Sequence, residues 1–225
     1  MSQSRNRLST GALVAIAIAL GAAVGVAGIY GKQSPSGNAP AAESLAQGES
    51  AASCETDPDL LARLKPLARG EVAAMAVREQ ALGLPPLAFT AADGSNASLA
   101  DFSGQAILVN LWATWCAPCR AEMPALSELQ SELGDADFQV LAINIDTGDV
   151  SKPQGFLDEI GVSNLGLYRD ASMGVFNTLK REGLAFGLPV TLMVGPDGCL
   201  LGAMNGPAEW ASEDAKALVS ALKAG

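Results

Sequence analysis

The chain is organised around Leu108-Val-Asn-Leu-Trp-Ala-Thr-Trp-Cys-Ala-Pro-Cys-Arg-Ala-Glu-Met-Pro124. This stretch starts inside an apolar run, residues 106–112, whose length and composition predict a buried strand. Apolar residues then recur at helical spacing from Cys119 to Leu133, which predicts a helix. Two cysteines separated by two residues, Cys116 and Cys119, therefore lie where a strand gives way to a helix.

This position favours redox chemistry of the two cysteines. The first turn of a helix has free N–H groups and the positive end of the dipole, which stabilise a thiolate at Cys116. The thiolate is the nucleophile of disulfide exchange. Pro118 suits the first turn, where no N–H is needed.

Two other interpretations of the pair are half of a zinc site and a disulfide that only braces a loop. Zinc commonly takes four ligands, from two such pairs or from one pair and two histidines. The chain has no histidine, and its other cysteines, Cys54 and Cys199, are distant in sequence. The sequence therefore predicts a redox pair and no metal site.

The charge of the chain limits its partners. The net charge is −10, and residues 33–225 hold all 24 acidic residues but 11 of the 14 basic ones. Such a surface repels nucleic acid and anionic lipid head groups. The length of 225 residues allows one domain of ordinary size with appendages.

Three segments precede the predicted domain. Residues 11–30 are uncharged and rich in Ala, Val, Ile and Leu, and at about 1.5 Å per residue they just span a bilayer core. The arginines in residues 1–10 predict a cytoplasmic N-terminus and an external body. A cleaved signal peptide is the alternative, although its apolar region is usually shorter. Residues 31–53, which are Ser-, Gly-, Ala- and Pro-rich, have the composition of a flexible linker.

Residues 54–225 alternate between strand and helix patterns. This alternation predicts an α/β domain with a mixed central sheet and helices on both faces. The predicted helices after residue 54 are 57–82 (broken at Pro66 and Gly70), 119–133, 154–160, 172–180 and 210–223, and the predicted strands are 84–89, 106–112, 138–146, 165–168, 190–194 and 199–204.

These features resemble the thioredoxin-like oxidoreductases, in which a Trp-Cys-Ala-Pro-Cys motif precedes a strand opened by a proline, here Pro189. The stretch 109–124 and the extra segment between Asp146 and Leu188 are similar to the membrane-anchored TlpA/ResA-type branch. More specific similarities to the TlpA type are the stretches 142–147 and 206–215 and the second cysteine pair. The resemblance runs from about Cys54 to the end. It implies a thioredoxin-like fold with an N-terminal helical extension and a TlpA-type insert.

The resemblance assigns roles to residues of the central stretch. Cys116 attacks a partner disulfide, and Cys119 then resolves the mixed disulfide. A glutamate linked to thiol titration in ResA-like proteins corresponds to Glu122, about one helical turn after Cys119. An exposed helix glutamate is the plainer interpretation of Glu122. Asn110 stands where thioredoxins have a buried aspartate, so it cannot accept the proton itself.

The same pattern implies a cis peptide bond before Pro189, which leaves the backbone of Leu188 free to pair with an extended substrate segment. The other interpretation is a proline that opens an edge strand. Trp115, Ala117 and Pro118 are expected to form the rest of the docking rim around the sulfur.

Cys54 and Cys199 complete an even number of cysteines in a chain with a predicted extracytoplasmic address, which favours a structural disulfide. The bond would tie the N-terminal extension to the strand after Pro189. A second redox relay is the alternative.

The implied function is a membrane-anchored thiol–disulfide oxidoreductase of the periplasm, held in the inner membrane by a single span. The Ala-Pro dipeptide between Cys116 and Cys119 is nearer to the Gly-Pro of reducing thioredoxins than to the pair of strong oxidants. TlpA-type members imply reduction of cysteine pairs in a Sco-like copper chaperone and in the copper subunit of cytochrome oxidase, with electrons from a membrane donor. No cofactor is implied.

Three other functions remain open at this stage. ResA-like relatives imply reduction of apocytochrome c thiols before haem attachment. A copper chaperone is disfavoured, because Sco-like proteins have a longer cysteine spacing and a histidine that this chain lacks. A non-catalytic interaction domain is disfavoured by the intact cysteine pair.

Overall fold

The computed structural model describes Cys54 and residues 56–225. The segments predicted as N-terminus, anchor and linker (1–10, 11–30 and 31–53) lie outside the described residues. Within the described part, no helix is long and apolar enough to cross a membrane.

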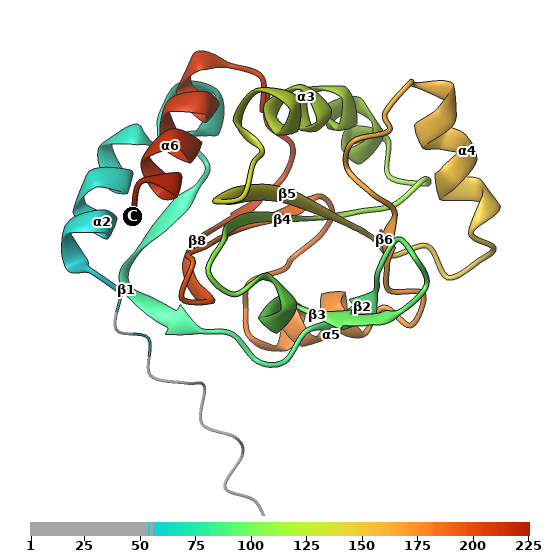
Figure 1. The fold of residues 1–225 in the computed structure, drawn as a ribbon, viewed down its shortest axis with the longest axis horizontal. Coiled ribbons are helices and arrows are strands. Elements are labelled where there is room, and N and C mark those ends of the chain that lie inside the picture. Colours follow the sequence, from blue (N-terminus) through green and yellow to red (C-terminus); the bar gives the residue numbers. More distant parts are fainter. Residues whose placement is uncertain (1–53, 55) are drawn as a thin grey trace, which may run out of the picture. The chain divides into compact units, whose positions relative to one another are not determined.

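The described chain forms one mixed sheet in the order β1-β8-β7-β4-β5-β6-β2-β3 (Figure 1). β4 pairs in parallel with β5 and antiparallel with β7. The strands are β1 (Ala76–Gly83), β2 (Ala88–Thr90), β3 (Asn96–Ser98), β4 (Ala106–Trp112), β5 (Phe138–Asn144), β6 (Tyr168–Arg169), β7 (Val190–Val194) and β8 (Cys199–Asn205).

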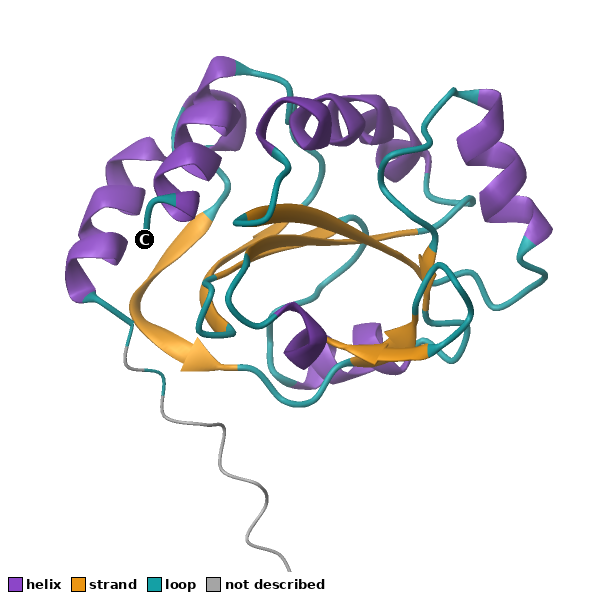
Figure 2. Ribbon diagram, viewed as in Figure 1, coloured by secondary structure: helices purple, strands orange, loops and turns teal. Residues whose placement is uncertain are grey.

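Helices cover both faces of this sheet, as the sequence predicted. Figure 2 shows them as separate layers around the strands, and Figure 1 places α2, α6, α3 and α4 on one face and α5 on the other. The α-helices are α2 (Pro58–Leu64), α3 (Ala117–Leu133), α4 (Ser151–Glu159), α5 (Gly174–Arg181) and α6 (Glu213–Lys223), and short 3₁₀ turns span Lys65–Leu67, Gly70–Val72 and Leu99–Phe102.

The central strand β4 is buried along its whole length. Its residue Trp112 lies opposite Asn144 at the end of β5, and Leu111 lies opposite Val190 at the start of β7. The carboxyl ends of β4 and β5 therefore lie beside the beginning of β7. We call these strand ends, with the loops that leave or enter them, the Cys116 end of the sheet.

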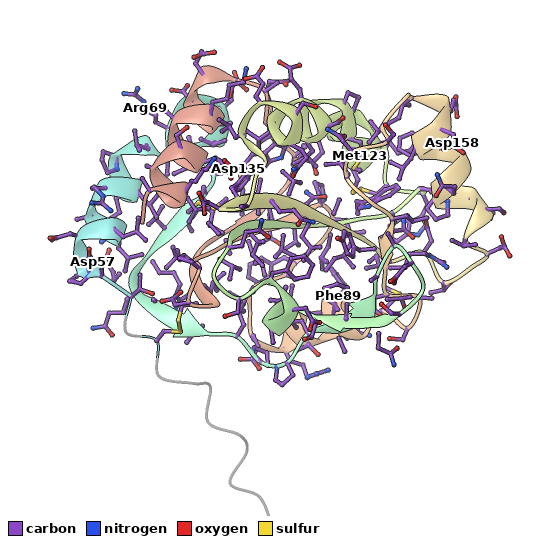
Figure 3. All side chains as sticks on the ribbon, in the orientation of Figure 1. Asp57, Arg69, Phe89, Met123, Asp135 and Asp158 are labelled. Atoms are coloured by element: carbon purple, nitrogen blue, oxygen red, sulfur yellow. A yellow bond between two sulfur atoms is a disulfide. The ribbon has the colours of Figure 1, made fainter. Side chains whose placement is uncertain are left out.

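Each face of the sheet has its own apolar core. Met123 of α3 is fully buried on one face, and Phe89 of β2 packs edge-on against Tyr168 on the other (Figure 3). Burying a side chain of this size contributes about 1.5–3 kcal/mol. The two cores hold α3 and the strands that flank it in fixed positions.

Three predicted elements differ from the structure. The predicted strand 165–168 shares only Tyr168 with β6, because Gly166 has a left-handed backbone (φ 62°) that interrupts an extended strand. Residues 76–82 were expected to be helical, but they belong to β1, which pairs antiparallel with β8. The residues of β1 favour a helix weakly, and a neighbouring strand with free backbone groups outweighs that preference. The predicted strand 84–89 begins only at Ala88, because Pro85 and Pro86 have no N–H for a ladder.

Candidate active site

Cys116 occupies the N-cap of α3. Its backbone is extended, and its sulfur accepts a hydrogen bond from the backbone N–H of Cys119 at 3.2 Å. The two cysteines form a disulfide, and both are buried, with Cys116 slightly more exposed than Cys119. When the pair is reduced, this N–H and the dipole of a 17-residue helix stabilise negative charge on the sulfur of Cys116.

Glu122 is not an exposed helix residue, since only 3% of it is accessible to solvent. Its Oε1 accepts a hydrogen bond from Asn110 Nδ2 at 2.8 Å. Its Oε2 accepts two more, from the backbone N–H of Ala208 at 3.2 Å and from Trp210 Nε1 at 3.1 Å. The carboxyl group is therefore fixed between α3, β4 and the loop that precedes α6.

Burial raises the pKa of Glu122 from 4.5 to about 7, against the opposing effect of the hydrogen bonds from Asn110, Ala208 and Trp210. Glu122 is thus poised to hold or release a proton near neutral pH. It lies three residues after Cys119 on the same helix face, where Cβ atoms are about 5–6 Å apart.

Asn110 connects this carboxyl group to the sheet. It is fully buried on β4, directly opposite Thr191 of β7 in the strand register. Asn110 Nδ2 donates a second hydrogen bond, to Thr191 Oγ1 at 3.1 Å. Asn110 Oδ1 is buried and has no partner among the described residues.

The loop before β7 also lies at the Cys116 end of the sheet. The Leu188–Pro189 peptide bond is cis, Pro189 is buried, and Leu188 is partly buried against both cores. Asn205 at the end of β8 holds this loop, because its Oδ1 accepts from the backbone N–H of Phe186 and its Nδ2 donates to the carbonyl of Leu184.

Two large apolar side chains are exposed in the loops at the Cys116 end of the sheet. Trp115, 65% exposed, follows β4, and Phe186, 79% exposed, precedes β7. A third exposed apolar residue, Val150, lies instead beside Ala91 and Ala92 in the turn between β2 and β3. Ala117 and Pro118 are exposed beside Cys116, whereas Trp112 belongs to the core. Apolar side chains exposed around a buried sulfur are typical of a surface that binds another protein.

A family model named Redoxin matches residues 77–219. The chain belongs to the Redoxin family. The match includes Cys116, Cys119, Glu122 and Pro189 and stops short of Cys54.

Curated relatives of this Redoxin domain include the thioredoxin-like protein YneN of Bacillus subtilis, 41% identical over 31% of this chain and 41% of that protein. Another is the thiol-disulfide oxidoreductase ResA of Oceanobacillus iheyensis, 37% identical over 30% of this chain and 34% of that protein. The chain thus matches well under half of the length of these relatives.

Solved structures confirm the thioredoxin-like fold of the Redoxin domain. The thioredoxin domain of a thiol-disulfide oxidoreductase from Bacteroides vulgatus has a TM-score of 0.50 at 21% identity, over 60% of this chain and 91% of that one. A secreted thiol-disulfide isomerase from Corynebacterium glutamicum has a TM-score of 0.51 at 22% identity, over 65% and 92%.

The second cysteine pair, Cys54 and Cys199, forms a disulfide that ties the start of the described chain to the Redoxin domain (Figure 3). Cys199 is the first residue of β8, and the next residue, Leu200, lies opposite Val194 of β7. Val194 in turn lies opposite Ile107, near the start of β4. Cys116 follows the other end of β4, about 20 Å away at the usual rise per strand residue. The two cysteine pairs therefore lie near opposite ends of β4.

Several residues of the Redoxin site were not identified from the sequence. They are Trp210, Ala208 and Thr191, which complete the surroundings of Glu122 and Asn110. Trp210 and Ala208 lie in a loop far along the chain, and only the pairing of β8 with β7 brings that loop to α3. Phe186 was also missed. An aromatic residue two positions before Leu188-Pro189 is the signal that could have indicated it.

Arg120 of α3 contacts another helix of the domain. Its guanidinium lies 4.7 Å from the centre of the Phe156 ring, a cation–π contact that holds α3 against α4. Among the residues that the structure describes, no group of three or more His, Cys, Asp or Glu side chains could hold a metal ion.

Proposed function

We propose that this chain is a thiol–disulfide oxidoreductase that reduces disulfides in other proteins. The observation that carries the proposal is the placement of Cys116 at the N-cap of α3, with its sulfur on an N–H donor and with buried Cys119 and Glu122 behind it. This arrangement favours a thiolate at the more exposed cysteine and supplies a proton acceptor beside the buried one.

The reaction begins with the reduced pair. The Cys116 thiolate attacks one sulfur of the partner disulfide, so that a mixed disulfide forms and the second partner sulfur leaves as a thiolate. Cys119 transfers its proton to Glu122 and attacks the sulfur of Cys116, which forms the Cys116–Cys119 disulfide and releases the other partner sulfur. Two electrons pass to the partner, and its two thiolates take up two protons, one of which Glu122 can return.

The proposed site of action is the periplasmic side of the inner membrane. Residues 11–30 would serve as a single-pass anchor and residues 31–53 as a tether, as their composition indicates. A tethered reductase in an oxidising compartment needs electrons from a donor in the membrane. The Cys54–Cys199 disulfide would then be a structural bond at the end of the tether, which suits that compartment.

The proposed partners are proteins whose cysteine pairs must be reduced before they bind copper. A Sco-like copper chaperone and the copper subunit of cytochrome oxidase are the candidates that the resemblance to the TlpA type supports. Trp115, Leu188 and the exposed atoms of Ala117 and Pro118 would dock the partner segment.

The activity is tested by reduction of insulin with the full chain, compared with the variant Cys116→Ser and with copper titration of both. Loss of reduction in the variant, with weak copper binding by both proteins, is the expected result. Tight copper binding that is lost in Cys116→Ser, without reduction of insulin by the unchanged chain, would identify a copper carrier instead.

The partner is tested by trapping. Cys119→Ser removes the resolving thiol, so partners should remain disulfide-linked to Cys116 when the variant is expressed in its native membrane. Copper-assembly proteins in the adduct would support the proposed role, whereas apocytochromes c would assign the chain to haem attachment.

A further inference from the structure

We propose that Asn110 is a positioning residue whose side-chain amide rotates by half a turn about χ2 when Glu122 gains or loses a proton. The use of this rotation in disulfide exchange rests on the proposed function, whereas the rotation itself follows from contacts of the described residues alone. The proposal concerns the three linked side chains of Glu122, Asn110 and Thr191.

The surroundings of Glu122 determine which of its oxygens can carry the proton. Oε2 faces two groups that can only donate, the backbone N–H of Ala208 and the indole N–H of Trp210. A proton on Oε2 would meet two other hydrogens and find no acceptor. The proton of neutral Glu122 therefore lies on Oε1, which faces Asn110.

Asn110 offers Oε1 a donor in the observed arrangement. Its Nδ2 lies 2.8 Å from Oε1, which suits an ionised Glu122. Neutral Glu122 needs an acceptor at the same place, and a half-turn of the amide about χ2 supplies Asn110 Oδ1 there. The unpartnered Oδ1 is the atom that this turn would use.

Thr191 can follow the turn without moving. Its hydroxyl oxygen accepts from Asn110 Nδ2 at 3.1 Å in the observed arrangement. After the turn the same hydroxyl can donate to Asn110 Oδ1, since a threonine hydroxyl both donates and accepts. Oδ1 then has two partners, at the cost of the two hydrogen bonds that Nδ2 donates before the rotation.

This mechanism explains why an amide suits the position. A carboxylate at residue 110 would place two like charges against each other, and an apolar side chain would leave Glu122 Oε1 without a partner in either state. No charged side chain contacts the Glu122 carboxyl group from β4, β7 or the loop before α6 within the described chain. The titratable groups nearest along the chain are Cys119, one helical turn before Glu122, and Cys116 at the N-cap of α3, and they do not titrate while they form the disulfide.

The test is an NMR titration of the oxidised full chain, labelled with ¹³C and ¹⁵N in Asn and Glu, between pH 5 and 9. We expect the Nδ2 and Cγ signals of Asn110 to shift with the same midpoint as the Cδ signal of Glu122. Asn144 is the matched control, since it is equally buried on β5 and both of its amide atoms are bonded to Asp146. Its signals should stay constant over this range.

A scalar coupling across the hydrogen bond between Asn110 Nδ2 and Glu122 Cδ decides between rotation of the amide and a passive electric-field effect, because the coupling exists only while Nδ2 donates to Oε1. It should be observed at pH 9, be lost at pH 5, and be absent from the variant Glu122→Gln, whose neutral amide can donate to Asn110 Oδ1. A coupling that persists at pH 5, or Asn110 signals that remain constant while Glu122 titrates, would overturn the proposal. Because the readout needs no catalysis, a failure of insulin reduction would contradict the proposed function and leave this result unaffected.

Discussion

Replacing Glu122 with Gln should make the folded chain more stable at alkaline pH and leave its stability nearly unchanged at acidic pH. The variant keeps the shape of the side chain and removes the charge. Its carbonyl can still accept from Ala208 and Trp210, and its amide can donate to Asn110 once the Asn110 amide has rotated so that Oδ1 takes the place of Nδ2. The difference in stability therefore reports mainly the cost of a buried carboxylate.

The magnitude follows from the pKa of Glu122, which burial raises from 4.5 to about 7. At about 1.4 kcal/mol per pH unit, this corresponds to about 3.5 kcal/mol. The folded chain holds the proton more tightly than the unfolded chain, so the wild type loses this stability as the pH rises from about 4.5 through 7. The variant loses none of it.

The assay is guanidinium unfolding of the full chain in mild detergent, with both disulfides intact, at pH values from 4 to 9. The stability advantage of the variant should grow from about zero to about 3.5 kcal/mol across this range. Glu128→Gln on the same helix is the control, because that side chain is half exposed and its replacement should change stability by less than about 0.5 kcal/mol. A difference between Glu122→Gln and wild type that does not depend on pH would refute the reasoning.

Three further predictions concern other parts of the domain. Trp115→Ala should raise the KM for a protein disulfide roughly 5- to 30-fold without affecting a small-molecule disulfide; equal effects in steady-state assays of both would argue against a docking role. Trp210→Phe removes one donor from Glu122 Oε2, so the Glu122 midpoint in an NMR titration should rise by about 1–2 pH units; an unchanged or lower midpoint would contradict this. Replacing both Cys54 and Cys199 with Ala opens a loop of 145 residues, which should lower the free energy of unfolding by about 2–5 kcal/mol while insulin reduction is retained. Loss of insulin reduction in a folded variant would instead favour a redox relay through Cys54 and Cys199.

Much of the fold could be predicted because local patterns and tertiary structure agree. The apolar run of β4 and the helical spacing after Cys119 indicate their elements directly, and both are found in the structure. β1 could not be predicted, because residues that favour a helix take a strand only when β8 is beside them.

Some residues of the candidate site could likewise be predicted from the sequence, and others could not. Cys116 and Cys119 are evident from a local motif at a strand–helix junction. The burial of Glu122 depends on Trp210 and Ala208, which the sequence places far away and the order of β7 and β8 brings near. Asn110 could be located on the central strand, but its partners depend on the register between β4 and β7.

The central claim is that Cys116 and Cys119 exchange a disulfide with a protein partner. The most direct measurement mixes the reduced full chain with insulin, quenches samples in acid and counts the free thiols of each protein by mass spectrometry after alkylation. The account predicts that the Cys116–Cys119 disulfide forms at the rate at which insulin thiols appear, one disulfide for each one reduced. Insulin reduction while Cys116 and Cys119 keep their thiols, or no transfer from the reduced pair, would contradict it.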